Sequence, residues 1–242
     1  MPLPGGSNSI IKTWYPREEP KLYKDPDDAP IEITQLPLKE LKAEYFDYAN
    51  RWEASGHRGK VWNQMRSIRA KEPIKEVICI GLGNFGERRL LHKDKAAPGA
   101  NKSSGSRTHH RINNTSLQQL IFLKTVLAEL ERHHNIGKVL FSDPAFSETE
   151  IKILSELDRR FRATTEPIPM SSGTFLYAPV VPVKVLHEYL QECFPVLYAG
   201  PPLDSSNKVE KDLVQRTNET KVAPNFLDGE GWEISYVFRW LK

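Results

Sequence analysis

The sequence predicts an α/β protein of the Rossmann-like, three-layer type, with a mostly parallel sheet and a helical N-terminal lead-in. Three observations predict this fold. Short apolar runs alternate with helical segments, the first buried run ends in a glycine-rich turn, and 242 residues suffice for one such domain. Strands that alternate with helices form parallel sheets that are covered on both faces.

The N-terminal segment, residues 1–37, is rich in proline and charge, as in YPREEPKLYKDPDDAP. Proline lacks an amide hydrogen and interrupts helices. We therefore expect a flexible N-terminal arm. Its apolar residues Ile31, Ile33 and Leu36 leave open the alternative that part of it docks as a strand. Residues 38–242 are expected to form a single domain.

Two helical segments begin this domain. Apolar residues recur at helical spacing in LKELKAEYFDYANRWEAS and again, after Ser55-Gly56, in GKVWNQMRSIRAK. The first segment carries a stripe of Tyr45, Tyr48 and Trp52, which predicts core packing rather than a ligand site. Pro73 ends the second segment.

The run EVICIG predicts a buried strand, and it continues into a glycine turn, Gly81-Leu82-Gly83-Asn84-Phe85-Gly86. This G-x-G-x-x-G pattern places a pyrophosphate at the start of the next helix in dinucleotide-binding folds. Here a polar, basic segment, 87–114, follows directly, and we interpret it as an insertion loop. We expect a tight turn in a crevice, with Gly86 incidental. The pattern leaves open whether the crevice takes a small anion or a nucleotide.

Helices and strands then alternate to the C-terminus. Helices are predicted in TSLQQLIFLKTVLAELERHH, capped by Thr115 or Ser116, and in SETEIKILSELDRRF, where Ser147 and Glu150 form a capping box. Further helices are predicted in VKVLHEYLQECF and DSSNKVEKDLVQRT. Strands are predicted at 139–142, 174–182 and 195–200 and in WEISYVFRWL.

Two polar residues are expected beside the glycine turn. The insertion can still return the next helix to the turn, so that Ser116 faces the glycines. Asp143 ends the second strand, where a carboxylate accepts a ribose hydroxyl in dinucleotide folds. The alternative is that Asp143-Pro144 only forms the turn after that strand.

Composition excludes several classes of function. The net charge of +3 disfavours a dedicated nucleic-acid binder. Cys79 and Cys193 lie in apolar runs, which predicts buried free thiols in a reducing compartment. No apolar run is long enough for a membrane span, and the N-terminus lacks the signal-peptide pattern. We expect a cytoplasmic or nuclear protein that does not associate with membranes.

The remaining candidates are weaker. His109-His110 lies in the insertion, and His133-His134 ends a helix, where positive charge suits the dipole and adjacent side chains diverge. The basic residues of the insertion can attract phosphate or nucleic acid, although a solvated loop is the simpler interpretation. They are Arg88, Arg89, Lys93, Lys95, Lys102, Arg107 and Arg111. No spacing of paired cysteines and no nucleophile elbow predicts a zinc or nucleophile site.

The order of the segments ICIGLGNF, SLQQLIFLKTVL, VLFSDPAFSETEIKIL, TFLYAPVVP, VLYAG and ISYVFRW resembles the SRR-type domain family, named for Sensitivity to Red Light Reduced. The resemblance covers roughly Trp52 to Trp240. The family signature falls on Gly81, Leu82, Gly83, Asn84, Ser116, Gln119, Leu120, Asp143, Pro144, Phe146, Tyr177, Pro179 and Gly200. The chain departs from the family in its long insertion and in GPPLDSS after the fourth predicted strand.

The resemblance implies a regulatory or signalling role, including light and clock signalling in plants, and it implies no reaction. We therefore expect a non-catalytic regulatory protein with a small-ligand crevice at the carboxyl ends of the strands. The ligand-binding candidates are Gly81, Gly83, Asn84, Ser116, Gln119, Asp143, Tyr177 and Gly200.

Two alternatives stay open. The first is a nucleotide- or S-adenosylmethionine-dependent enzyme of the methyltransferase or oxidoreductase type. The second is a module that binds nucleic acid or a protein partner through the basic insertion. The sequence does not identify a cofactor, a catalytic residue, a metal ligand or an oligomeric state.

Overall fold

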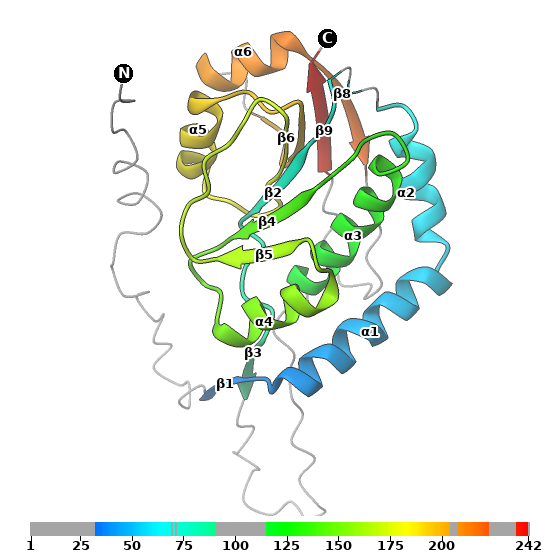
Figure 1. Ribbon diagram of the computed structural model, residues 1–242, viewed down its shortest axis with the longest axis vertical. Helices are drawn as coiled ribbons and strands as arrows, with labels where there is room; N and C mark the ends of the chain where they lie inside the picture. Colours follow the sequence, from blue (N-terminus) through cyan, green and yellow to red (C-terminus); the bar gives the residue numbers. More distant parts are fainter. Residues whose placement is uncertain are drawn as a thin grey trace, which may run out of the picture.

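The computed structural model describes residues 32–68, 70, 72–90, 115–203, 208–222 and 236–241. Their centre is a seven-stranded sheet with the strand order β5-β4-β2-β6-β7-β9-β8 (Figure 1). In that order the strands are Phe161–Thr164, Lys138–Ser142, Glu76–Ile80, Thr174–Tyr177, Leu197–Gly200, Tyr236–Leu241 and Thr217–Val222. The first five are parallel, and β9 is antiparallel to both β7 and β8. This is the predicted α/β fold with a mostly parallel sheet.

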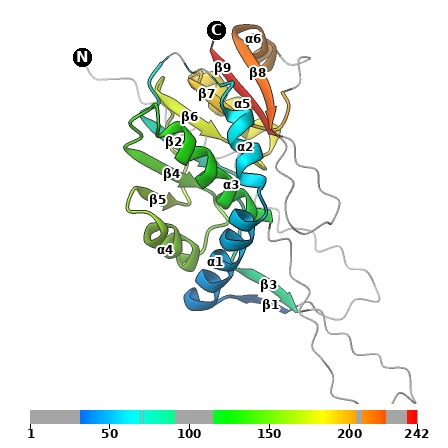
Figure 2. The ribbon, with the colours of Figure 1, turned by 90° about the vertical axis from the view of Figure 1, so that its right-hand side faces the viewer.

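Helices pack on both faces of this sheet (Figure 2). One layer contains α1 (Leu38–Ala54), α2 (His57–Met65), α3 (Thr115–Leu130) and α4 (Glu148–Leu157), and the other contains α5 (Val183–Glu192) and α6 (Lys208–Arg216). Strand β2 connects the layers, because successive side chains of a strand point to opposite faces. Val77 and Cys79 join the larger core under α1–α4, whereas Ile78 and Ile80 join the smaller core under α5 and α6.

The helical lead-in packs against α3, as its aromatic stripe predicts. Tyr45, Tyr48 and Trp52 are buried on the inner side of α1. The indole N–H of Trp52 donates a hydrogen bond of 3.0 Å to the Thr125 hydroxyl. These aromatic residues therefore belong to the core.

A two-stranded antiparallel ribbon lies beside the main sheet. It joins β1 (Glu32–Gln35) to β3 (Glu87–Leu90). Leu36 follows β1, is 7% exposed, and donates its amide to the Gly86 carbonyl at 2.8 Å.

This ribbon corrects two predicted boundaries. The expected arm, 1–37, ends in a paired strand, and the expected insertion, 87–114, begins in one. The sequence concealed the pairing because it joins segments that lie far apart in the chain. The rest of both segments, 1–31 and 91–114, lies outside the described residues.

The two cysteines differ in burial. Cys79 is buried in β2, as predicted, whereas Cys193 is partly exposed. Cys193 is the C-terminal capping residue of α5, where the chain leaves the packed helix. Burial raises the pKa of both thiols. No helix in the described part of the chain combines the length and apolar character that a membrane span needs.

Candidate functional site

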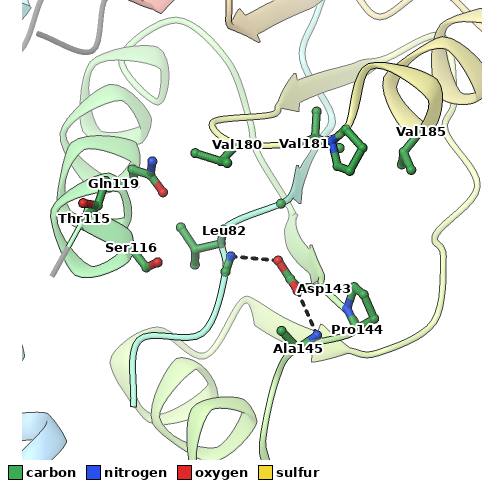
Figure 3. A pocket seen from close by; sticks show the side chains of 13 residues that line it. Leu82, Thr115, Ser116, Gln119, Asp143, Pro144, Ala145, Val180, Val181 and Val185 are labelled. Atoms are coloured by element: carbon green, nitrogen blue, oxygen red, sulfur yellow. Dashed lines mark hydrogen bonds between the residues drawn. The ribbon is translucent and has the colours of Figure 1, made fainter. Parts of the chain in front are cut away.

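A cavity of about 210 Å³ opens at the carboxyl ends of β2, β4 and β6 (Figure 3). We call it the crevice. Its lining residues are Gly81, Leu82, Gly83, Thr115, Ser116, Gln119, Asp143, Pro144, Ala145, Val180, Val181, Pro182 and Val185. β4 and β6 flank β2 on opposite sides, so the strand order reverses there. Open α/β sheets bind ligands at this kind of switch point.

Two glycines of the turn after β2 form one wall of the crevice. Gly81 has a φ of 68° and Gly83 a φ of 78°, a left-handed conformation that side chains disfavour. A Cβ atom on Gly81 would lie 2.1 Å from the Val180 carbonyl oxygen, and one on Gly83 would lie 3.1 Å from the Ser116 hydroxyl. Glycine is therefore needed at Gly81 for both conformation and space.

Asp143 fixes this turn from the end of β4. One carboxylate oxygen accepts the Gly83 N–H at 2.7 Å, and the other accepts the Ala145 N–H at 2.9 Å (Figure 3). Asp143 is 4% exposed, and burial raises its pKa while the two amide bonds act in the opposite direction. Asp143 thus forms the turn after the strand and also lines the crevice.

Glu150 holds the rest of the glycine turn. It is fully buried in the first turn of α4, where it forms the predicted capping box with Ser147. One of its oxygens also accepts the N–H groups of Phe85 and Gly86, the latter at 2.8 Å. Burial raises the pKa of Glu150, and its hydrogen bonds lower it. Sequence reasoning found the cap but missed the contact with the turn.

Gly86 lies outside the crevice lining and contacts the ribbon through its backbone. Its N–H also lies 3.0 Å from the Asn84 side-chain oxygen, and its carbonyl accepts the Leu36 amide. A Cβ atom there would lie 2.3 Å from the Gln35 amide nitrogen. Gly86 therefore connects the glycine turn to the ribbon, a structural role.

The helix α3 forms the opposite wall. It begins at Thr115, so Thr115 and Ser116 belong to its first turn, and the cap position lies outside the described residues. Ser116 faces Gly83, as predicted. Neither Thr115 nor Ser116 is the cap that the sequence predicted, because both already lie inside the helix.

Gln119 is the most deeply buried polar side chain of this wall, at 1% exposure. Its amide nitrogen and the Tyr236 hydroxyl have no hydrogen-bond partner among the described residues. Burial raises the pKa of Tyr236, and hydrogen-bonding contacts with the side chains of Tyr177 and Gln119 act in the opposite direction, so these three groups face one another without reaching normal hydrogen-bond geometry for the Gln119 nitrogen. Buried polar atoms without partners are uncommon and call for an explanation.

Three predicted site residues lie outside the crevice lining. Asn84 turns toward the loop after β4, where its amide nitrogen lies 3.4 Å from the Ala145 carbonyl. Tyr177 is fully buried, and its hydroxyl donates to the Gln119 carbonyl at 3.1 Å. Gly200 leaves room for the Tyr198 hydroxyl, which would lie 2.3 Å from an added Cβ atom.

The Tyr177 bond predicts a simple result. Tyr177→Phe should lower the free energy of unfolding by about 1 kcal/mol, because the hydrogen bond from its buried hydroxyl to the Gln119 backbone carbonyl is lost. Urea denaturation measures this loss. An unchanged midpoint would show that the hydroxyl contributes nothing to stability.

A second cavity, of about 570 Å³, lies between the ends of α2 and α3 and is lined in part by His133 and His134. The His134 ring nitrogen accepts the Ile74 N–H at 3.3 Å. Burial lowers the pKa of His134, and His133 adds to this effect. The described residues contain no cluster of three or more His, Cys, Asp or Glu side chains suited to a metal ion.

Comparison with known proteins identifies the family. The search of curated proteins returned no match. Among solved structures, the chain is similar to the 16S rRNA methylase RmtB, with 11% identity, a TM-score of 0.38, and coverage of 86% of this chain and 76% of that one. A likeness this slight supports no argument about function. The SRR1 domain matches residues 61–228, most of the chain, and this range contains every signature residue from Gly81 to Gly200. The chain belongs to the SRR1 domain family.

Proposed function

We propose that the protein is a non-catalytic regulatory protein of the cytoplasm or nucleus that responds to a small ligand bound in the crevice. The observation that carries this proposal is the meeting of three strand ends and the start of α3 around one cavity. Ligand sites of open α/β sheets are found at this position. The signalling role implied by the family resemblance supports a regulatory outcome of binding.

The rim of the crevice supports ligand binding. Val180 lines the cavity and is 63% exposed. Exposed apolar side chains at the mouth of a cavity are typical of surfaces that contact a ligand.

The electrostatics of the crevice favour binding over turnover. Asp143 is the one carboxylate among the described lining residues. Both of its oxygens accept backbone N–H groups, so taking a proton from a substrate would weaken a bond that holds the turn. A general base needs an oxygen or nitrogen that can take up this proton. The enzyme alternative therefore lacks support from the described residues.

The test is a thermal-shift screen of nucleotides, nucleosides and small fragments, combined with an assay for chemical change of each compound that binds. A ligand at 100 times its Kd stabilises a folded protein by about 2.7 kcal/mol. Val180→Trp should fill the crevice and abolish the shift, because this exposed side chain tolerates enlargement. Val183→Trp is the matched control and should retain the shift.

Two outcomes contradict the proposal. Conversion of a bound compound that Val180→Trp abolishes would establish an enzyme. Absence of stabilisation by the whole screen, in folded protein, would remove the ligand crevice.

A further inference from the structure

The N–H groups of the glycine turn already donate hydrogen bonds to carboxylates of the protein itself. The N–H of Gly83 binds Asp143, and the N–H groups of Phe85 and Gly86 bind Glu150. A phosphate at a glycine turn is held by such N–H groups and by the positive end of a helix. A phosphate in the crevice would compete with Asp143 for the Gly83 N–H, and the N–H groups of Phe85 and Gly86, outside the lining, are already bound by Glu150.

The described part of the lining provides no basic side chain to compensate. The described residues around the crevice include one carboxylate, that of Asp143, and no Lys, Arg or His. A phosphate placed there would be repelled by Asp143, and among the described lining residues only the start of α3 would attract it, without an ion pair. The crevice therefore favours neutral or cationic groups beside the glycine turn.

The polar groups of Asp143 and Gln119 that remain available suit a ligand with hydroxyl donors and a hydrogen-bond acceptor on a ring. An ionised carboxylate accepts about four hydrogen bonds, and Asp143 uses one on each oxygen. The amide nitrogen of Gln119 is buried beside the Tyr236 hydroxyl and makes no hydrogen bond of normal geometry among the described residues, and Gln119 lines the cavity. Figure 3 shows this side chain extending from α3 on the side where Val180 lies.

The size and walls of the crevice narrow the choice further. Its volume of about 210 Å³ is below the range of roughly 300–1,000 Å³ that encloses drug-sized ligands. Leu82, Val181 and Val185 present apolar surface to it. A flat ring with an attached sugar suits these walls better than an entire dinucleotide.

We propose that the crevice binds a nucleoside that carries no phosphate beside the glycine turn. Its ribose hydroxyls donate to Asp143, its ring or ribose accepts a hydrogen bond from Gln119, and its base packs on the valines. The close approach of the ribose to the turn uses the missing side chains of Gly81 and Gly83. This inference rests on the proposed function, because it requires a ligand in the crevice.

Calorimetry on the full chain tests the inference. The panel contains adenosine, guanosine, uridine, cytidine and S-adenosylmethionine, with AMP, ATP and 2′,3′-dideoxyadenosine for comparison. At least one phosphate-free nucleoside should bind. Adding a 5′-phosphate, or removing both ribose hydroxyls, should weaken its binding by at least tenfold.

A pair of variants separates binding from folding. Gln119→Leu should change the unfolding temperature little, because the buried amide nitrogen that it removes makes no hydrogen bond of normal geometry among the described residues. It should also weaken the nucleoside about tenfold. Gln118→Leu, its neighbour outside the lining, should leave the affinity unchanged.

The outcomes distinguish this inference from the proposed function. Tighter binding of AMP or ATP than of the nucleoside overturns the inference and leaves a ligand crevice in place. The same holds if only non-nucleoside fragments bind and Val180→Trp abolishes their binding. If nothing in either panel binds folded protein, both the inference and the proposed function fail.

Discussion

Replacing Gly81 with alanine is expected to destabilise the protein by about 3–5 kcal/mol, which combines overpacking with the cost of a left-handed conformation. The new Cβ atom would lie 2.1 Å from the Val180 oxygen and 2.8 Å from its carbonyl carbon. Both are backbone atoms, so no side chain can rotate away. The turn after β2 or the loop after β6 must move, and the crevice must widen or lose its shape.

Thermal unfolding measures this effect, with an expected fall in Tm of about 10 °C. Gly59→Ala is the control, because Gly59 lies in α2 with no atom within 4 Å of an added Cβ. It should be neutral or stabilising, since alanine favours helix. Equal effects of the two substitutions would contradict the close approach of Gly81 to Val180.

Glu150→Gln is expected to destabilise the protein by about 2–3 kcal/mol, because a buried N–H donor loses its acceptor. One oxygen of Glu150 accepts two amides of the glycine turn, and the other accepts the Ser147 N–H at 2.8 Å. A glutamine supplies one oxygen only. Its NH₂ group must face an N–H donor at the other position.

Glu148→Gln provides the matched control in the same helical turn. Glu148 is exposed, and its substitution should change the free energy of unfolding by less than about 0.5 kcal/mol. Urea denaturation of the two variants compares them directly. A loss at Glu150 no larger than that at Glu148 would mean that this carboxylate does not anchor the turn.

The strands that the sequence predicted and those that it missed differ in position. β2, β4, β6 and β7 lie inside the sheet, and their apolar runs predicted them. β5 and β8 lie at its two edges, and neither was predicted. Their sequences, FRAT and TNETKV, carry polar and charged residues, which blunt an exposed edge and also remove the apolar signal.

The candidate site was predicted in part for a similar reason. The glycines, Ser116 and Asp143 lie next to predicted strand ends or a helix start, so their meeting followed from the fold. The role of Glu150 did not follow, because it accepts amides 64 and 65 residues earlier in the chain. The capping box uses one carboxylate oxygen of Glu150 and leaves the other available. Only the folded structure shows which N–H groups that second oxygen accepts.

The packing of α1 and the pairing of β1 indicate where a fragment of this protein must begin in order to fold. The family match begins at residue 61, inside α2, but the buried face of α1 covers α3 through Tyr45, Tyr48 and Trp52. A fragment cut at the family boundary would expose that surface of α3 to water and leave Thr125 without its indole donor. A fragment that begins at residue 38 would still lack the strand that pairs with β3. Expression of this protein in pieces should therefore begin before residue 32, well upstream of the part that the family shares.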